Sequence, residues 1–148
     1  CMYRVFYTII SIAVLSNILA CSSRPKVDTE VSFSSENPNE KKSPSLRFSE
    51  DFYDFGSIIQ GEIVSHTFHF SNTGNDILII KDLIPDCGCT QPKIDKKVLN
   101  PGEEGTVEVI FDSKGWHGSQ YKSVTLRTNS PIRDKSVTIK ANVVEPKD

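Results

Sequence analysis

Two cysteines one residue apart are the residues of this sequence best placed to do chemistry. Cys87 and Cys89 stand in the run Asp-Cys-Gly-Cys-Thr, far along the chain from Cys1 and Cys21. A turn at Gly88 would bring their Cα atoms into the range of about 4.4–6.8 Å that a disulfide requires. The same pair could exchange disulfides with a partner, or hold a soft metal ion such as Cu(I) or Zn(II).

In an oxidising compartment the pattern favours a disulfide that pins its own loop, with redox exchange, a metal site and two inert small residues as alternatives. The metal site is the weakest alternative, because zinc needs about four ligands and the chain has only 3 histidines. His66 and His69 are three apart on one predicted strand and therefore face opposite sides, and His117 lies in a glycine-flanked turn. We expect no metal and no cofactor.

A second candidate is aromatic. Trp116 lies between Gly115 and Gly118 in a predicted loop. Its ring could close the end of the hydrophobic core, or it could contact a partner or a glycan, because Trp is enriched at binding hot spots. Tyr121, a few residues further on, would extend such a contact surface.

The other polar residues match no catalytic motif. The sequence has no nucleophile-elbow pattern around a serine and no glycine-rich loop that would cradle a phosphate. With 17 basic and 19 acidic residues and a net charge of −2, it also lacks the basic field that nucleic acids require. We therefore expect neither an enzyme nor a nucleic-acid-binding protein.

The N-terminal part resembles an export signal. Residues 1–20 carry Arg4 and then an apolar run ending in small residues, as in a secretory signal peptide. The run Ile18-Leu19-Ala20-Cys21 resembles the lipobox of bacterial lipoproteins, which implies that Cys21 carries fatty-acyl chains such as palmitate. Cys1 precedes Met2, which we take as the natural start, and Cys1 has no assigned role.

Two further expectations follow for the region after Cys21. Ser22 and Ser23 place no acidic residue directly after the lipidated cysteine, which favours the outer membrane, facing the periplasm. Residues 21–45 are rich in Ser, Asn, Glu, Lys and Pro and predict a flexible linker, since such a segment buries too little apolar surface to fold. As a coil it would span roughly 25 to 30 Å.

Residues 46–148 show the period-two alternation of half-buried strands. It is clear in the segments 64–70, 107–111, 124–127 and 137–143, while the unbroken apolar run 77–80 predicts a more central strand. Asn72-Thr73-Gly74-Asn75 and Asn100-Pro101-Gly102 predict turns, the second of type II. The pattern predicts an all-β chain: a single immunoglobulin-like antiparallel β-sandwich of about seven strands.

An ordered set of short motifs in this region resembles the bacterial domain-of-unknown-function family 1573, which is related to the Hydin-type immunoglobulin-like domains. The motifs are Tyr53-Asp54-Phe55-Gly56, Gly61-Glu62, His66-Thr67-Phe68, Asn72-Thr73-Gly74, Cys87-Gly88-Cys89-Thr90, Leu99-Asn100-Pro101-Gly102-Glu103, Val109-Ile110-Phe111-Asp112 and Leu126-Arg127-Thr128-Asn129. The resemblance implies a β-sandwich and an envelope setting in Bacteroidetes-like bacteria, and it implies no established activity.

The leading functional hypothesis is a non-catalytic binding or scaffolding module, lipid-anchored to the membrane and contacting a protein partner in the envelope. The contact would use the loops at one end of the sandwich or an exposed edge strand. The alternative is an accessory protein that handles thiols and disulfides, or a metal such as copper or zinc, through Cys87 and Cys89.

Overall fold

The computed structural model describes residues 41–147. The predicted signal peptide 1–20, Cys1, the predicted lipidation site Cys21 and the linker up to residue 40 lie outside the described residues. Within residues 41–147, no helix is long and apolar enough to span a membrane.

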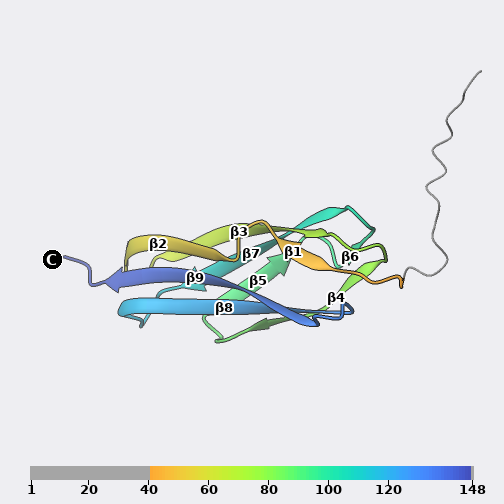
Figure 1. Ribbon diagram of the computed structural model, residues 1–148. Helices are drawn as coiled ribbons and strands as arrows, with labels where there is room; N and C mark the ends of the chain where they lie inside the picture. Colours follow the sequence, from red (N-terminus) through yellow and green to blue (C-terminus); the bar gives the residue numbers. More distant parts are fainter. Residues whose placement is uncertain (1–40, 148) are drawn as a thin grey trace, which may run out of the picture. The chain divides into compact units, whose positions relative to one another are not determined.

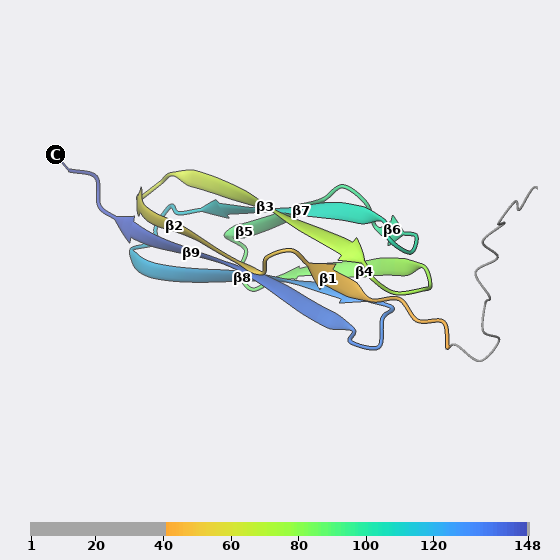
Figure 2. The ribbon, with the colours of Figure 1, turned by 45° about the horizontal axis from the view of Figure 1, so that its top comes forward.

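The described chain is all β, as predicted (Figure 1). The strands are β1 (Leu46–Phe48), β2 (Phe52–Ile59), β3 (Ile63–Asn72), β4 (Leu78–Pro85), β5 (Thr90–Ile94), β6 (Val98–Leu99), β7 (Glu104–Asp112), β8 (Gly118–Thr128) and β9 (Asp134–Val144). They form a 4-stranded sheet in the order β1-β3-β7-β5 and a 5-stranded sheet in the order β2-β9-β8-β4-β6. The two sheets lie face to face as the layers of a sandwich (Figure 2).

Nine strands are present where about seven were expected, because the first strand changes sheets and is counted twice and because the two-residue β6 is counted as a strand. β1 pairs antiparallel with β3, and β2 pairs parallel with β9 in the opposite sheet. The crossing segment makes one backbone hydrogen bond to each sheet: Ser49 N donates to His69 O, and Asp51 O accepts from Thr138 N. One continuous segment is therefore counted as two short strands, and the pairing of β2 is the exception to the antiparallel prediction.

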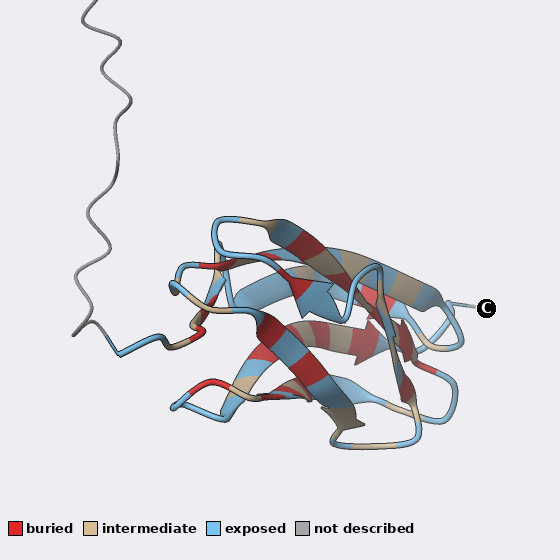
Figure 3. Ribbon diagram, turned by 90° about the vertical axis from the view of Figure 1, so that its right-hand side faces the viewer, coloured by how far each residue is buried: buried red, intermediate tan, exposed pale blue. Residues whose placement is uncertain are grey.

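The core lies between the layers, where strand residues alternate between buried and exposed (Figure 3). The predicted period-two segments supply it: Phe68 and Phe70 from β3, Val107, Val109 and Phe111 from β7, Val124 and Leu126 from β8, and Val137, Ile139, Ala141 and Val143 from β9 are all buried. Burying such side chains contributes roughly 1.5–3 kcal/mol each. The alternation in the sequence is thus the cause of the two-layer fold.

The apolar run 77–80 predicts a more central strand, and β4 has a neighbour on each side, β8 and the two-residue β6. Leu78 and Ile80 are buried, but Ile77 is 45% and Ile79 is 41% exposed. An antiparallel sandwich leaves the outer face of each sheet in water, so part of this apolar run is exposed apolar surface.

The two ends of the sandwich are distinguished by the segments that reach them. The tether end is where residues 41–45 join the domain; it also holds the turns 73–77, 100–103 and 129–133. The distal end holds the turns 60–62, 86–89 and 113–117 and the C-terminal end of β9. The C-terminal residues leave the sandwich on the side opposite to residue 41 (Figure 1).

At the tether end, contacts with the sandwich begin before Leu46. Ser43, Pro44 and Ser45 were assigned to the linker, yet Pro44 is buried and both serines are hydrogen-bonded to the turn after β3. The predicted type II turn is confirmed: Glu103 N donates to Asn100 O over 3.0 Å, and Gly102 has a φ of 78°.

Candidate functional site

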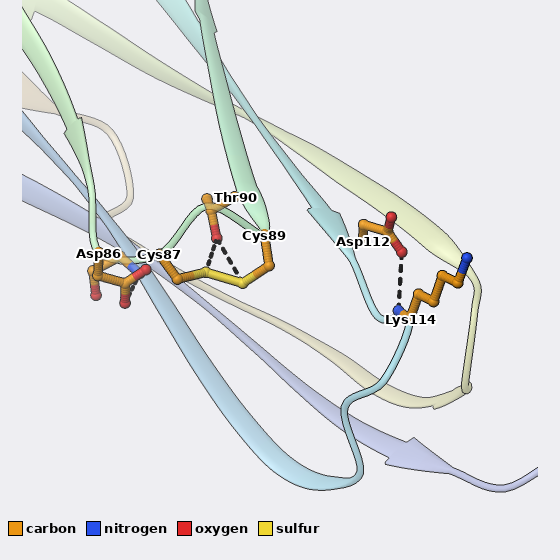
Figure 4. The surroundings of a disulfide bond; sticks show 7 residues. Asp86, Cys87, Cys89, Thr90, Asp112 and Lys114 are labelled. Carbon is orange, nitrogen blue, oxygen red and sulfur yellow. Dashed lines mark hydrogen bonds between the residues drawn. A yellow bond between two sulfur atoms is a disulfide. The ribbon is translucent and has the colours of Figure 1, made fainter.

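Cys87 and Cys89 are joined by a disulfide in the turn between β4 and β5, with their Cα atoms 5.3 Å apart. The turn carries the chain from one sheet to the other at the distal side (Figure 4). Both cysteines are half-buried, and Cys89 also packs against the core. The two sulfurs therefore lie at the boundary between the core and the solvent.

Backbone contacts hold this turn on both sheets. Before the pair, Asp86 N donates to Ser123 O on β8 over 3.0 Å, and the Asp86 carboxylate accepts from Ser123 N over 2.8 Å. After the pair, Cys89 O accepts from Asp112 N on β7 over 3.1 Å. Thr90 N closes the turn by donating to Cys87 O over 3.2 Å.

The Thr90 side chain lies directly against the disulfide (Figure 4). Its Oγ1 is 3.3 Å from Cys87 Sγ and 3.8 Å from Cys89 Sγ, and Thr90 itself is 2% exposed. Among residues 41–147, these sulfurs are the hydrogen-bond partners of the hydroxyl. Because a disulfide sulfur is a weak acceptor, this buried hydroxyl is only weakly satisfied while the bond is intact.

A shallow groove of about 90 Å³ opens beside the disulfide on the outer face of the four-stranded sheet. It is lined by Ile63, Cys89, Gln91, Ile110 and Asp112. The register places Ile63 opposite Asp112 and Gln91 opposite Ile110, so the lining comes from three adjacent strand ends. Cys89 is thus reached from a hollow with two isoleucine side chains and two polar side chains, whereas Cys87 does not line it.

Trp116 packs against the end of the core and is partly buried. The Nζ atom of Lys122, a residue 7% exposed, lies 3.5 Å from the centre of its ring, a cation–π contact. The Trp116 backbone oxygen accepts from Gln60 Nε2 over 2.8 Å. These contacts match the interpretation in which Trp116 closes the core, and they leave part of its ring accessible.

Tyr121 does not extend a surface with Trp116. It is 57% exposed and precedes the inward-facing Lys122 on β8, so it points to the outer face of the five-stranded sheet. Its cross-strand neighbour is Lys140, which forms an ion pair of 2.9 Å with Asp54 on β2. The two aromatic residues proposed as one contact therefore belong to different faces.

Ser113 organises the tip of the distal end. This buried residue donates through its hydroxyl to Glu62 O over 2.7 Å and accepts from Gly61 N over 3.0 Å. The turn between β2 and β3 is thereby fixed against the end of β7. The flanking aliphatic side chains remain in water: Ile59 is 48%, Ile63 is 67% and Val144 is 40% exposed.

The histidines behave as structural residues. His66 stacks on Tyr53 with ring centres 3.6 Å apart, and its Nε2 is 2.7 Å from a Glu50 carboxylate oxygen. His69 and His117 are exposed at separate places, and His66 and His69 face opposite sides as predicted. Within the described range, no group of three or more His, Cys, Asp or Glu side chains is arranged to hold a metal.

The ionisable pairs of the described domain lie on its surface. The hydrogen bond from Lys140 lowers the pKa of Asp54, that from Lys96 lowers the pKa of Glu103, and that from Arg127 lowers the pKa of Asp134. Each shift favours the charged form at neutral pH, the opposite of what a carboxylic acid serving as a general acid requires. These pairs fasten neighbouring strands or turns.

Sequence reasoning missed three residues of this region: Thr90, Ser113 and Lys122. Thr90 follows the second cysteine directly and was quoted in a motif, but its burial could not be inferred. Lys122 had a signal, because it occupies the inward position of β8 in phase with Val124 and Leu126. Ser113 gave no signal, since its role depends on two turns that are distant in the sequence.

The fold recurs in solved structures of low sequence identity. A protein of unknown function from Porphyromonas gingivalis W83 superposes with a TM-score of 0.61 at 16% identity, over 72% of this chain and 51% of that one. The ASH/PapD-like domain 7 of human CEP192 gives 0.54 at 10% identity, over 71% and 89%. The VesB protease of Vibrio cholerae gives 0.52 at 18% identity, over 68% and 31%. At these identities the likeness shows the immunoglobulin-like, PapD-like fold alone.

This chain spans about half the length of the Porphyromonas gingivalis protein. No curated protein has a significant sequence match to it. A family model does match, over residues 46–143, from the start of β1 to the last residue but one of β9. The sequence and the fold agree, and the chain belongs to the family described as "Protein of unknown function (DUF1573)".

Proposed function

We propose that this protein is a non-catalytic binding or scaffolding module of the bacterial cell envelope, held by acyl chains on Cys21 in the outer membrane and facing the periplasm. Its partner is another exported protein. The observation that carries the proposal is the exposed aliphatic surface of the distal end, made by Ile59, Ile63 and Val144.

The distal surface has the composition of a protein contact. Ile59 and Val144 are direct neighbours in the parallel pair of β2 and β9, and Ile63 lies just across the turn. Burial of the exposed part of each side chain would contribute about 1 kcal/mol or more. Gln60 and Glu62 lie between them and supply a polar rim.

The position of this surface also favours it over the tether end. The chain that leads back to Cys21 joins the sandwich at the tether end, where Ser43, Pro44 and Ser45 already cover the turn after β3. A hollow of about 160 Å³ there is lined partly by this same segment. A partner approaching the tether end would meet Ser43, Pro44 and Ser45, whereas none of residues 41–45 lines the groove at the distal end.

Pairing along an edge strand is the less favoured mode. Asp112 N donates to Cys89 O and Asp95 N donates to Thr106 O, so by alternation Pro92 faces the open side of β5. Proline has no N–H to offer an added strand. β1 and β6 have 3 and 2 residues, and β2 contains a register shift; short and irregular edges resist pairing.

Separation of envelope extracts by size tests the proposed contact with a partner protein. The full chain is exported in the bacterium that makes it, and envelope extracts in mild detergent are separated by size for the native chain, Ile63→Asp and Ile132→Asp. Ile63 and Ile132 are 67% and 65% exposed, at the distal and the tether end respectively, which makes them a matched pair.

The proposal predicts that the native chain and Ile132→Asp migrate in a complex larger than the monomer and that Ile63→Asp migrates as the monomer. A monomeric native chain, or equal behaviour of the two variants, would overturn the proposed contact.

Location is tested by fractionation: the native chain should sediment with the outer membrane, and Cys21→Ser should be released. Retention of Cys21→Ser in the membrane would refute the lipid anchor.

A further inference from the structure

We propose that the Cys87–Cys89 disulfide is a thiol–disulfide exchange site that accepts two electrons from a dithiol on a docked exported protein. Cys89 is the sulfur attacked and Cys87 is the leaving group. The inference rests on the proposed function for the docking of the partner, while the chemistry itself rests on the surroundings of the two sulfurs.

The first argument is the buried Thr90 hydroxyl. In the oxidised pair its hydrogen faces divalent sulfur, with the nearer contact at 3.3 Å to Cys87 Sγ. Reduction would place a thiolate there, and hydrogen bonds to charged acceptors are about twice as strong as neutral ones. The site is therefore better satisfied after the bond opens, which favours reduction compared with a disulfide in apolar surroundings.

The second argument is the asymmetry of the pair. The hydroxyl is nearer to Cys87 than to Cys89, at 3.3 against 3.8 Å. The nearer hydroxyl favours the negative charge on Cys87 Sγ when the bond breaks, and a better-stabilised thiolate leaves faster.

The third argument is access. The sulfur that is to be attacked belongs to the residue lining the groove of about 90 Å³, beside Ile63 and Ile110. Ile63 is also the most exposed member of the proposed contact surface. An apolar side chain next to a partner's cysteine could occupy this hollow and bring its thiol alongside Cys89.

The exchange balances without any further reagent. A partner thiol loses its proton to water, and its thiolate attacks Cys89 Sγ, forming a mixed disulfide while the Cys87–Cys89 bond breaks and Cys87 leaves as a thiolate. The partner's second thiol also loses its proton to water, and its thiolate attacks the partner's first sulfur and releases Cys89 as a thiolate. The partner gains a disulfide, Cys89 takes up one of the two released protons, and the other proton stays in water while the Cys87 thiolate keeps the hydrogen bond from the Thr90 hydroxyl. Each molecule of this protein therefore oxidises one partner dithiol and is itself reduced in the process.

The fold can tolerate the reduced state. By the chain-entropy estimate, a bridge closing a loop of three residues stabilises the folded state by only about 1.5 kcal/mol, against about 4.7 kcal/mol for a 100-residue loop. The turn also keeps its backbone bonds to Ser123 and Asp112 after reduction.

The test is a redox titration of the full chain, purified in mild detergent without reductant and equilibrated with glutathione buffers. Alkylation followed by mass analysis of the tryptic segment 82–93 reports Cys87 and Cys89 without interference from Cys1 and Cys21. The proposal predicts that glutathione reduces the pair while circular dichroism remains that of the folded domain. Resistance to glutathione, or unfolding on reduction, would overturn it.

Thr90→Val and Thr90→Ser test whether the Thr90 hydroxyl changes the equilibrium constant for reduction. Valine keeps the buried volume and loses the hydroxyl, so the equilibrium constant for reduction should fall about tenfold, a potential more negative by about 30 mV. Serine keeps the hydroxyl and should remain within about twofold of the native chain. An unchanged constant in Thr90→Val would contradict the role of the hydroxyl.

Docking is separated from chemistry by two reductants: dithiothreitol, and a synthetic peptide with two cysteines flanking an isoleucine. Acid-quenched mixtures with the peptide should carry it on Cys89, and attachment mainly to Cys87 would overturn the assignment. Ile63→Ser, which removes the apolar contact without adding a charge, should slow exchange with the peptide about tenfold and change the rate with dithiothreitol by less than about twofold. Loss of the Ile63 effect alone would count against the contact surface, whereas resistance to both reductants would count against the exchange site.

Discussion

The two ends of the sandwich are fixed by similar devices but differ in what they leave exposed. At the tether end the buried Asn72 side chain accepts from Ser45 N and Gly74 N and donates to Asp76 O and Leu99 O. At the distal end Ser113 fixes the turn of residues 60–62. Both ends use a buried polar residue to satisfy turn backbone.

The difference lies around those anchors. The tether end encloses its own leading segment: a Cβ atom on Gly74 would overlap the backbone of Ser43 and Ser45. Both ends leave aliphatic side chains in water: Ile77, Ile79, Val98 and Ile132 at the tether end, and Ile59, Ile63 and Val144 at the distal end. The distal end adds a disulfide beside a groove that the leading segment 41–45 does not line. This contrast is the basis for assigning function to the distal end.

The largest effect we expect is at the tether end. Asn72→Ala removes four hydrogen bonds from a buried position, and we expect a loss of about 4 kcal/mol in the free energy of unfolding. Urea unfolding followed by Trp116 fluorescence measures it. Asn75→Ala, at an exposed residue that accepts one bond from Ser43 N, is the control and should cost less than about 1 kcal/mol. Equal losses of unfolding free energy in the two variants would contradict the anchoring role of Asn72.

The next effect concerns Trp116 and Lys122 at the distal end. Trp116→Ala should cost about 2 kcal/mol, below the range for a fully buried Trp because the ring is only partly buried. Lys122→Met keeps the apolar stem and removes the charge over the ring, and should cost about 1 kcal/mol. Circular dichroism during urea unfolding follows both variants. If Trp116→Ala does not change the free energy of unfolding, the ring does not close the core, and Trp116 is again a candidate contact residue.

A smaller effect is expected for the disulfide. The double variant Cys87→Ser, Cys89→Ser should remain folded and lose about 1.5 kcal/mol. The measurement is the urea midpoint in non-reducing buffer, with the native chain in reductant as the comparison. A loss of more than about 4 kcal/mol would make the bridge a main structural element of the distal end and remove the grounds for treating it as a reactive group.

The smallest effect is electrostatic and lies at the tether end, beside the turn 129–133. The hydrogen bond from Arg127 lowers the pKa of Asp134 in the folded state. Its contribution is therefore present above the unfolded pKa of about 3.9 and is lost as the pH falls through the lower folded pKa. Asp134→Asn should have a slightly lower melting temperature than the native chain at pH 7, and the difference should vanish near pH 2. A difference that persists at pH 2 would assign the effect to packing.

The fold could be predicted because it depends on a local pattern. Val107, Val109 and Phe111 alternate with polar residues, and strand geometry turns that alternation into one buried face. The type II turn at Asn100-Pro101-Gly102 was predictable for the same reason. The change of sheet between β1 and β2 was not, because it depends on which neighbours are available to Ser49 and Asp51.

The candidate site was predictable only in part. Spacing alone suggested a bridge between Cys87 and Cys89, but not the Thr90 hydroxyl beside it or the groove that reaches Cys89. Those features join β3, β5 and β7, which are distant in sequence. The lysine facing Trp116 was also unforeseen, since Lys is rarely buried without a partner and the partner here is a ring.

The most direct test of the account is to compare the two ends in living cells by photo-cross-linking. A photoreactive amino acid replaces Ile63 at the distal end or Ile132 at the tether end of the full chain, and the two residues are almost equally exposed. The account predicts that Ile63 yields one dominant adduct with an exported protein, that an added Ile59→Asp change weakens it, and that Ile132 does not yield it. Equal adducts from both positions, or the dominant adduct from Ile132, would contradict the assignment of function to the distal end.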